Sequence, residues 1–101
     1  MEIAGVQFSD EGGLWIGQLD TDFGPMEVML SGDSNGPSDG HADAFRRFVE
    51  NLSRNLLQVR KQVRLGFLFS PIRIAPNNEN RVGVQFRNKI TGRQIGMYFW
   101  N

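Results

Sequence analysis

The chain has 101 residues, of which 40% are hydrophobic, and its 11 acidic residues balance its 11 basic ones. It contains no cysteine, which excludes disulfides, a thiolate nucleophile and cysteine-based zinc or iron–sulfur sites. This length predicts one domain with a single core. Residues 1–20 hold no basic residue and no apolar run long enough for a signal peptide or a membrane span. We therefore expect a soluble, cytoplasmic protein with no membrane partner.

The charges are distributed unevenly along the chain. Residues 1–50 contain ten acids and two bases, whereas residues 51–101 contain one acid and nine bases. The two halves thus carry net charges of −8 and +8. Two arrangements stay open: the halves interleave so that the charges pair across the fold, or they form two separate charged faces.

The N-terminal third predicts three strands in an antiparallel meander. Residues 3–8 alternate apolar with small or polar residues, and Ser9 to Gly13 has the composition of a turn. Residues 14–19 are apolar on both sides, which is typical of a central strand. Residues 23–31 follow as a third strand, with Pro25 near its start. Residues 32–38 then form a polar loop rich in glycine and serine.

Residues 39–64 are predicted to form one long amphipathic helix. Its apolar positions are separated by three or four residues: Phe45, Phe48, Val49, Leu52, Leu56, Val59 and Val63. Ser38 or Asp39 can cap its first turn, and Gly66 is a natural stop. At 1.5 Å per residue such a helix would be roughly 39 Å long, so we expect it to kink or to project past the sheet.

Residues 67–101 predict a second strand meander. A strand over 67–75 contains Pro71, which indicates an edge or a bulge. Residues 81–87 alternate cleanly, and residues 94–100 form the last strand after a turn at Gly92. The predicted fold class is therefore α+β: a single domain over 1–101 in the order β-β-β-α-β-β-β, with one helix packed on a mainly antiparallel sheet.

The sharpest local pattern is Gly32-Asp33-Ser34-Asn35-Gly36, which fits the G-x-S-x-G motif of serine hydrolases. The general base would be His41, the single histidine of the sequence. Because Pro37 separates Ser34 from the helix and the chain has no room for an α/β-hydrolase sheet, loop chemistry accounts better for these residues. A small serine hydrolase is kept as the third hypothesis.

The segment Asp39 to Asp43 also resembles a group of metal ligands. On a helix, however, Asp39 and Asp43 share a face from which His41 points away. A calcium loop starting at Asp33 would place Ala44 where the bidentate glutamate belongs. We therefore assign no metal, no cofactor and no catalytic residue.

A nucleic-acid interpretation would use the basic second half of the chain. Its stacking groups would be aromatic residues of the C-terminal strands: Phe67, Phe69, Phe86, Tyr98, Phe99 and Trp100. Strand alternation places most of them in the core instead, and the neutral total charge weakens electrostatic attraction to nucleic acid. Nucleic-acid binding or self-association through these strands, giving a homodimer, is therefore the second hypothesis.

Several features span most of the sequence and together resemble a known group of proteins. They are an early Trp-x-Gly strand at Trp15 and Gly17, a Gly/Ser/Asp loop, a helix with Phe45, Phe48, Asn51 and Asn55, and an Ile-Arg-Ile strand at residues 72–74. This pattern resembles small bacterial immunity proteins of polymorphic and contact-dependent toxin systems. The resemblance implies a protein that occludes a toxin or effector domain.

The first hypothesis is therefore a non-enzymatic protein-binding module, an immunity or inhibitor protein acting by steric and electrostatic blockade. The acids around the helix start would complement a basic cleft in the partner and direct association. The candidate partner-binding residues are Asp20, Asp22, Glu27, Asp33, Asp39 and Asp43. The bland alternative is that acids in turns and in a first helical turn are simply solvated.

Overall fold

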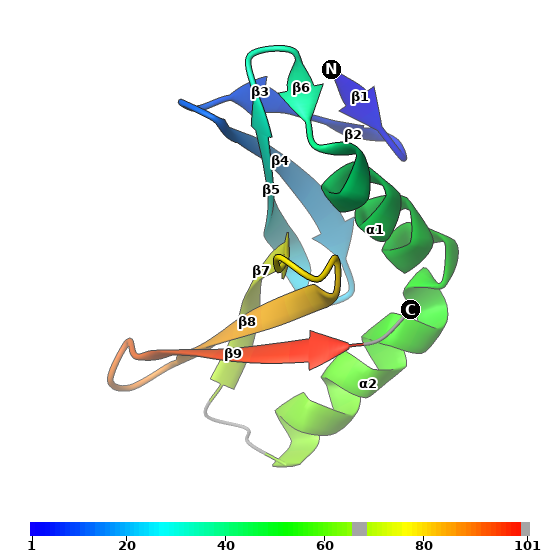
Figure 1. Ribbon diagram of the computed structural model, residues 1–101. Coiled ribbons are helices and arrows are strands. Elements are labelled where there is room, and N and C mark those ends of the chain that lie inside the picture. Colours follow the sequence, from blue (N-terminus) through cyan, green and yellow to red (C-terminus); the bar gives the residue numbers. More distant parts are fainter. Residues whose placement is uncertain (66–68, 100–101) are drawn as a thin grey trace.

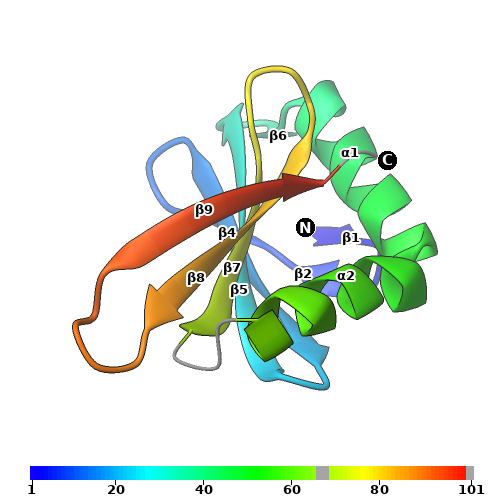
Figure 2. The same cartoon turned by 90° about the horizontal axis from the view of Figure 1, so that it is seen from below.

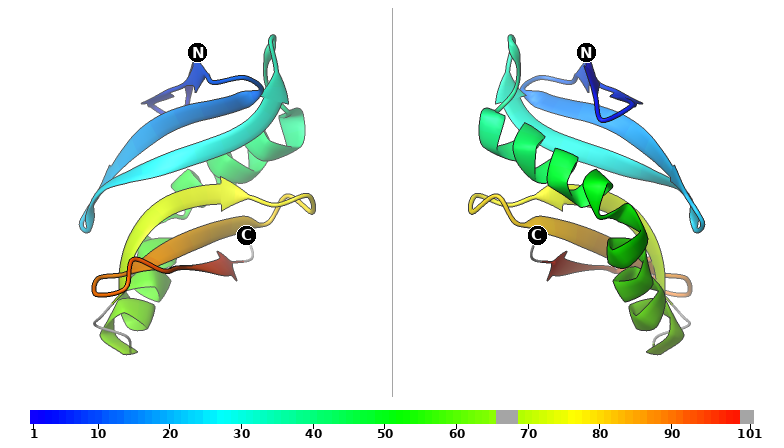
Figure 3. Two further views of the ribbon diagram at one scale, coloured as in Figure 1. Left: turned by 90° about the vertical axis from the view of Figure 1, so that its left-hand side faces the viewer. Right: turned by 90° about the vertical axis from the view of Figure 1, so that its right-hand side faces the viewer.

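A strongly twisted sheet with two helices on one of its faces organises the computed structural model, which describes residues 1–65 and 69–99 (Figures 1 and 3). The N-terminal strands are β1 (Glu2–Ile3), β2 (Val6–Gln7), β3 (Ser9–Asp10), β4 (Leu14–Thr21), β5 (Gly24–Asp33) and β6 (Gly36–Pro37). The helices α1 (Asp39–Glu50) and α2 (Leu52–Leu65) follow, and then β7 (Phe69–Pro76), β8 (Val82–Asn88) and β9 (Gln94–Phe99). The domain is thus α+β, as predicted.

The strand order in the main sheet is β3-β4-β5-β7-β8-β9, and β6 pairs with the end of β5. Adjacent strands of this sheet run antiparallel, except β5 and β7. These two strands are parallel, and the two helices form the crossover that connects them. β5 and β7 share only two register pairs, Glu27 with Arg73 and Val28 with Ile74. Beyond these pairs the two parts of the sheet splay apart, and Figure 3 shows this divergence. The mainly antiparallel sheet is therefore confirmed, but the order β-β-β-α-β-β-β is not.

The prediction of one strand over residues 3–8 is wrong. Ala4 and Gly5 have φ of 50° and 82°, so the chain reverses between them and Glu2–Ile3 pairs with Val6–Gln7. Ser9–Asp10, which the sequence predicts as a turn, is instead the short strand β3. An alternating six-residue segment fits a strand and a two-residue hairpin equally well when a glycine lies at its centre.

The single helix predicted over 39–64 is also wrong, because the helix breaks at Asn51. The Asn51 side chain donates to the carbonyl O of Arg47, and Nδ2 of the buried Asn55 donates to the carbonyl O of Phe48. These side chains satisfy backbone carbonyls at the break between two regular helices. The kink lets α1 and α2 follow the curvature of the sheet (Figure 1).

The predicted apolar stripe does face the sheet. Phe45, Phe48 and Val59 are fully buried, while Val49, Leu52 and Leu56 are partly buried. The side chain of Val63 lies outside the described part of the chain, as does Gly66. Ser38 is the N-cap, as expected, and its Oγ accepts a hydrogen bond from the His41 N–H. Pro71 lies beside a bulge in an interior strand.

The opposite layer of the core comes from alternate residues of the sheet. Met26, Val28 and Leu30 of β5 and Val82 and Val84 of β8 are fully buried beneath the helices. The N-terminal segment closes the core near α1, where the rings of Phe8 and Phe45 make an edge contact with centroids 5.7 Å apart.

Candidate functional site

The structure separates the six acids that the sequence analysis groups together. Asp20 and Asp22 lie at the tip of the β4–β5 hairpin, Glu27 lies within β5, and Asp33 ends β5. A ten-residue strand at about 3.3 Å per residue puts the two ends of β5 roughly 30 Å apart. Asp39 and Asp43 lie on α1. The six carboxylates therefore do not form one continuous patch.

Three of these acids are paired with bases of the protein itself. Asp22 lies 3.1 Å from Arg60, Glu27 lies 2.8 Å from Arg73, and Asp43 lies 2.8 Å from Arg46. The first two pairs join the acidic half of the sequence to its basic half. The Arg73 side chain, which is 23% exposed, also donates to the side-chain oxygen of Gln85. Pairing across the fold thus accounts for part of the charge asymmetry.

Asp33 and Asp39 have local structural roles. The Asp33 side chain accepts from the Asn35 N–H at 2.8 Å, in the turn between β5 and β6, and its carbonyl accepts from Nε1 of Trp15. Asp39 is the first residue of α1, where its charge favours the positive end of the helix dipole. These contacts are those expected of a turn and a helix start.

Asp20 and Asp22 border a groove between the tip of the β4–β5 hairpin and α2. This hairpin-tip groove has a volume of about 570 Å³ and is lined by Asp20, Thr21, Asp22, Leu52, Ser53, Leu56, Leu57 and Arg60. Leu52, Leu56 and Leu57 come from α2, and Leu57 is 55% exposed. The groove therefore combines an apolar wall on the helix with residues of the hairpin tip, where the Asp22 carboxylate bonds Arg60.

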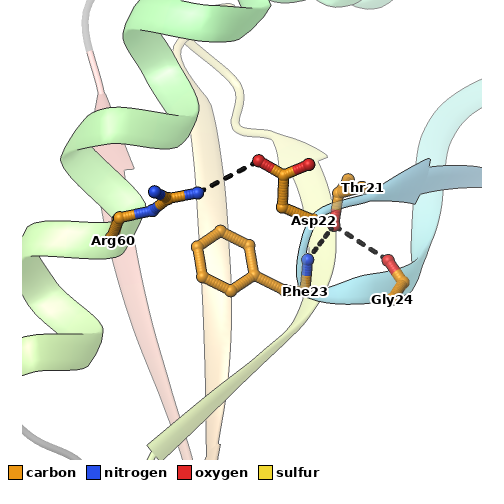
Figure 4. Close-up of polar contacts among 5 residues, drawn as sticks. All are labelled: Thr21, Asp22, Phe23, Gly24 and Arg60. Atoms are coloured by element: carbon orange, nitrogen blue, oxygen red, sulfur yellow. Dashed lines mark hydrogen bonds and ion pairs between the residues drawn. The ribbon is translucent and has the colours of Figure 1, made fainter.

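Hydrogen bonds fix the hairpin tip beside the helix (Figure 4). Oγ1 of Thr21 donates to the Gly24 carbonyl at 2.8 Å and accepts from the Phe23 N–H at 3.1 Å. Gly24 has φ of 89°, a conformation that glycine adopts without strain. The Phe23 ring points toward α2 and packs against the core. One side of the groove is therefore anchored through both Phe23 and the Arg60–Asp22 pair.

This arrangement can accept an apolar side chain next to a positively charged one. The exposed Leu57 offers apolar area that water now covers. Asp22 forms an ion pair with Arg60, whereas Asp20 forms none with those residues whose side chains the structure describes. A carboxylate beside an apolar wall matches the chemistry of a lysine or arginine with its aliphatic stem.

His41 is buried, and both of its ring nitrogens bond to backbone groups. Nδ1 accepts from the Ser31 N–H at 3.0 Å, which leaves Nε2 as the protonated nitrogen that donates to the Asn77 carbonyl at 3.2 Å. Ser34 is exposed in the turn between β5 and β6. Within residues 1–65 and 69–99 no three acidic or histidine side chains gather as metal ligands.

The aromatic residues proposed for stacking on bases are divided between the core and the undescribed part of the chain. Phe86 is buried, and Phe69 is partly buried against the core. Phe67 and Trp100 lie outside the described residues, as do the side chains of Tyr98 and Phe99. The described aromatic side chains are therefore engaged in packing.

Leu57, the exposed part of the apolar wall, was not identified from the sequence. Leu57 follows Leu56 and lies off the apolar stripe of the helix. A large apolar residue off the stripe of an amphipathic helix is a signal of an exposed apolar contact, and it could have identified this position.

No protein-family model matches the chain, and neither the curated proteins nor the solved structures provide a match. Among the described residues, no helix is long and apolar enough to cross a membrane.

Proposed function

We propose that the protein is a non-enzymatic binding module, an inhibitor of the immunity-protein type that blocks a toxin or effector by occupying its surface. The observation that carries this proposal is the hairpin-tip groove, which the exposed Leu57 lines together with Asp20 and Asp22. The groove contacts a partner segment that presents an apolar side chain beside a lysine or arginine.

The two kinds of group in the groove have different roles. Burial of Leu57 against an apolar side chain supplies affinity, at about 25 cal/mol per Å² of apolar surface removed from water. Asp20 directs the approach of a basic partner and penalises an acidic one. The remaining acids of the original set contribute through their charge at longer range, since Glu27 and Asp43 are already paired with arginines.

The positions of His41 and Ser34 support the non-enzymatic part of the proposal. A histidine that bonds backbone groups through both ring nitrogens is held as a structural link between β5, α1 and the β7–β8 loop. A serine hydrolase would need one of those nitrogens to accept the proton of Ser34.

Affinity capture from a lysate of the native source tests the groove. The bait is the wild-type protein, beside Leu57→Asp and Asp20→Asn as groove variants. Asp33→Asn is a poor control because its carboxylate fixes a turn, so the matched control is Glu50→Gln, an exposed acid at the end of α1. Each sample is run with and without nuclease treatment.

We expect the wild type and Glu50→Gln to retain the same protein partner, and both groove variants to lose it. A partner that binds all four proteins equally would show that the groove is not the contact surface. Capture that disappears after nuclease treatment would contradict protein binding and favour the nucleic-acid hypothesis.

A further inference from the structure

The two edges of the main sheet differ in how well they are protected against pairing with a strand of another chain. At one edge, β3 has only two residues and is followed by the turn after Asp10, while the β1–β2 hairpin folds over β4. Val6 and Phe8 pass so close to Gly17 of β4 that a Cβ there would lie 2.7 Å from Cγ1 of Val6. Short strands and covering segments of this kind prevent edge-to-edge association.

The opposite edge is β9, and none of the described residues pairs with its outer side. β9 has six residues, Gln94-Ile95-Gly96-Met97-Tyr98-Phe99, without a charge or a proline. The views from the front and from below place it at the end of the sheet (Figures 1 and 2). Ile95, which shares a face with the buried Phe86 through their register, is 49% exposed. As far as residues 1–65 and 69–99 show, this edge lacks the usual protective features.

The hydrogen-bond ladder between β8 and β9 determines which backbone groups of β9 point away from β8. The Asn88 N–H donates to the Arg93 carbonyl at 2.8 Å, so the pair at the start of the ladder is hydrogen bonded. Hydrogen-bonded and non-hydrogen-bonded pairs alternate along antiparallel strands. The N–H and C=O groups of Gln94, Gly96 and Tyr98 consequently point away from β8, toward the open edge.

We propose that a second copy of the chain pairs antiparallel with β9, with the two-fold axis at Gly96. These three residues are evenly spaced about Gly96, so Gly96 lies opposite Gly96 of the second copy and Gln94 lies opposite Tyr98. Every outward backbone group then has a partner, which gives about six hydrogen bonds between the copies. A contact in which the same edge serves both copies is the isologous contact of a two-fold dimer.

The side chains of the edge are compatible with this partner. Two copies of β9 oppose no like charges within the paired strands, because β9 carries none. The half-exposed Ile95 lies within the paired segment, so the second copy covers an apolar side chain. The edge lies apart from the hairpin-tip groove, and this inference does not depend on the proposed function.

Disulfide trapping tests the register directly, since the natural chain has no cysteine. In a hydrogen-bonded antiparallel pair the Cα atoms lie about 5.5 Å apart, which is within the range that a disulfide spans. We expect Gly96→Cys to form a covalent dimer rapidly under mild oxidation. Thr91→Cys, in the exposed β8–β9 turn, is the control and should stay largely monomeric.

Analytical ultracentrifugation of the cysteine-free protein is the second measurement. We expect a concentration-dependent dimer for the wild type, and a monomer for Gly96→Lys, which opposes two ammonium groups at the axis. Thr91→Lys adds the same charge in the turn and should remain dimeric. A wild type that is monomeric up to millimolar concentration, or equal trapping of both cysteine variants, would overturn the proposal.

Discussion

His41 links three segments that are distant in the sequence. Its ring accepts from the backbone of β5 at Ser31 and donates to the β7–β8 loop at Asn77, while its own backbone lies in the first turn of α1. A buried imidazole with both nitrogens satisfied fixes how the helix start lies on the sheet. At the scale of single residues, this side chain has the clearest structural consequence.

We expect His41→Ala to lower the free energy of unfolding by about 2–3 kcal/mol, because it removes two hydrogen bonds and leaves the Ser31 N–H without its acceptor. Urea denaturation measures the change. Glu50→Ala, at an exposed site of the same helix, should shift stability by less than about 0.5 kcal/mol. Equal effects of the two substitutions would contradict the structural role of His41.

Gly17 marks a close approach of the N-terminal segment to β4. An added Cβ would lie 2.8 Å from the Gln7 carbonyl O and 3.0 Å from Cδ1 of Phe8, so the segment would have to move. We expect Gly17→Ala to destabilise the protein by about 1–3 kcal/mol through overpacking. Thermal unfolding beside Gln18→Ala, an exposed neighbour in the same strand, checks this; a fully tolerated alanine would argue against the close contact.

At the scale of elements, asparagine side chains bond the backbone carbonyls at the break between α1 and α2. Asn55 is 3% exposed, and its Nδ2 lies 3.0 Å from the Phe48 carbonyl O. We expect Asn55→Leu to cost about 1–3 kcal/mol, because a buried carbonyl loses its donor. Ser53→Ala, at an exposed site of α2, is the control. Unchanged stability of Asn55→Leu in urea would show that the kink does not require this contact.

The elements also show what the sequence could predict. The helix face was predictable because Phe45, Phe48 and Val59 keep the helical period, and the bulge near Pro71 because proline lacks a donor. A kink was expected from the length of the helix, but its position at Asn51 was not predictable, since the position depends on carbonyls that only the folded helix places. The groove was not predictable either, because it forms where Asp22 and Arg60, 38 residues apart in sequence, come together.

At the scale of the whole molecule, two ion pairs connect the acidic and basic halves of the chain, and we expect them to contribute unequally to the free energy of unfolding. Arg73 is 23% exposed and also bonds Gln85, whereas the Arg60 and Asp22 side chains are 50% and 71% exposed. In double-mutant cycles we expect a coupling of about 1–2 kcal/mol for Arg73 with Glu27, and less than about 1 kcal/mol for Arg60 with Asp22. A larger coupling for the exposed pair would contradict this ranking.

Charge and apolar area both contribute to the proposed function of the groove beside α2, which is to bind and block a partner protein. The most direct measurement is a titration of the captured partner's own activity with the wild type and with Leu57→Asp. We expect stoichiometric inhibition by the wild type and a loss of inhibition by Leu57→Asp, with the folded state of the variant verified by circular dichroism. A partner that stays fully active at saturation, or equal inhibition by both proteins, would contradict it.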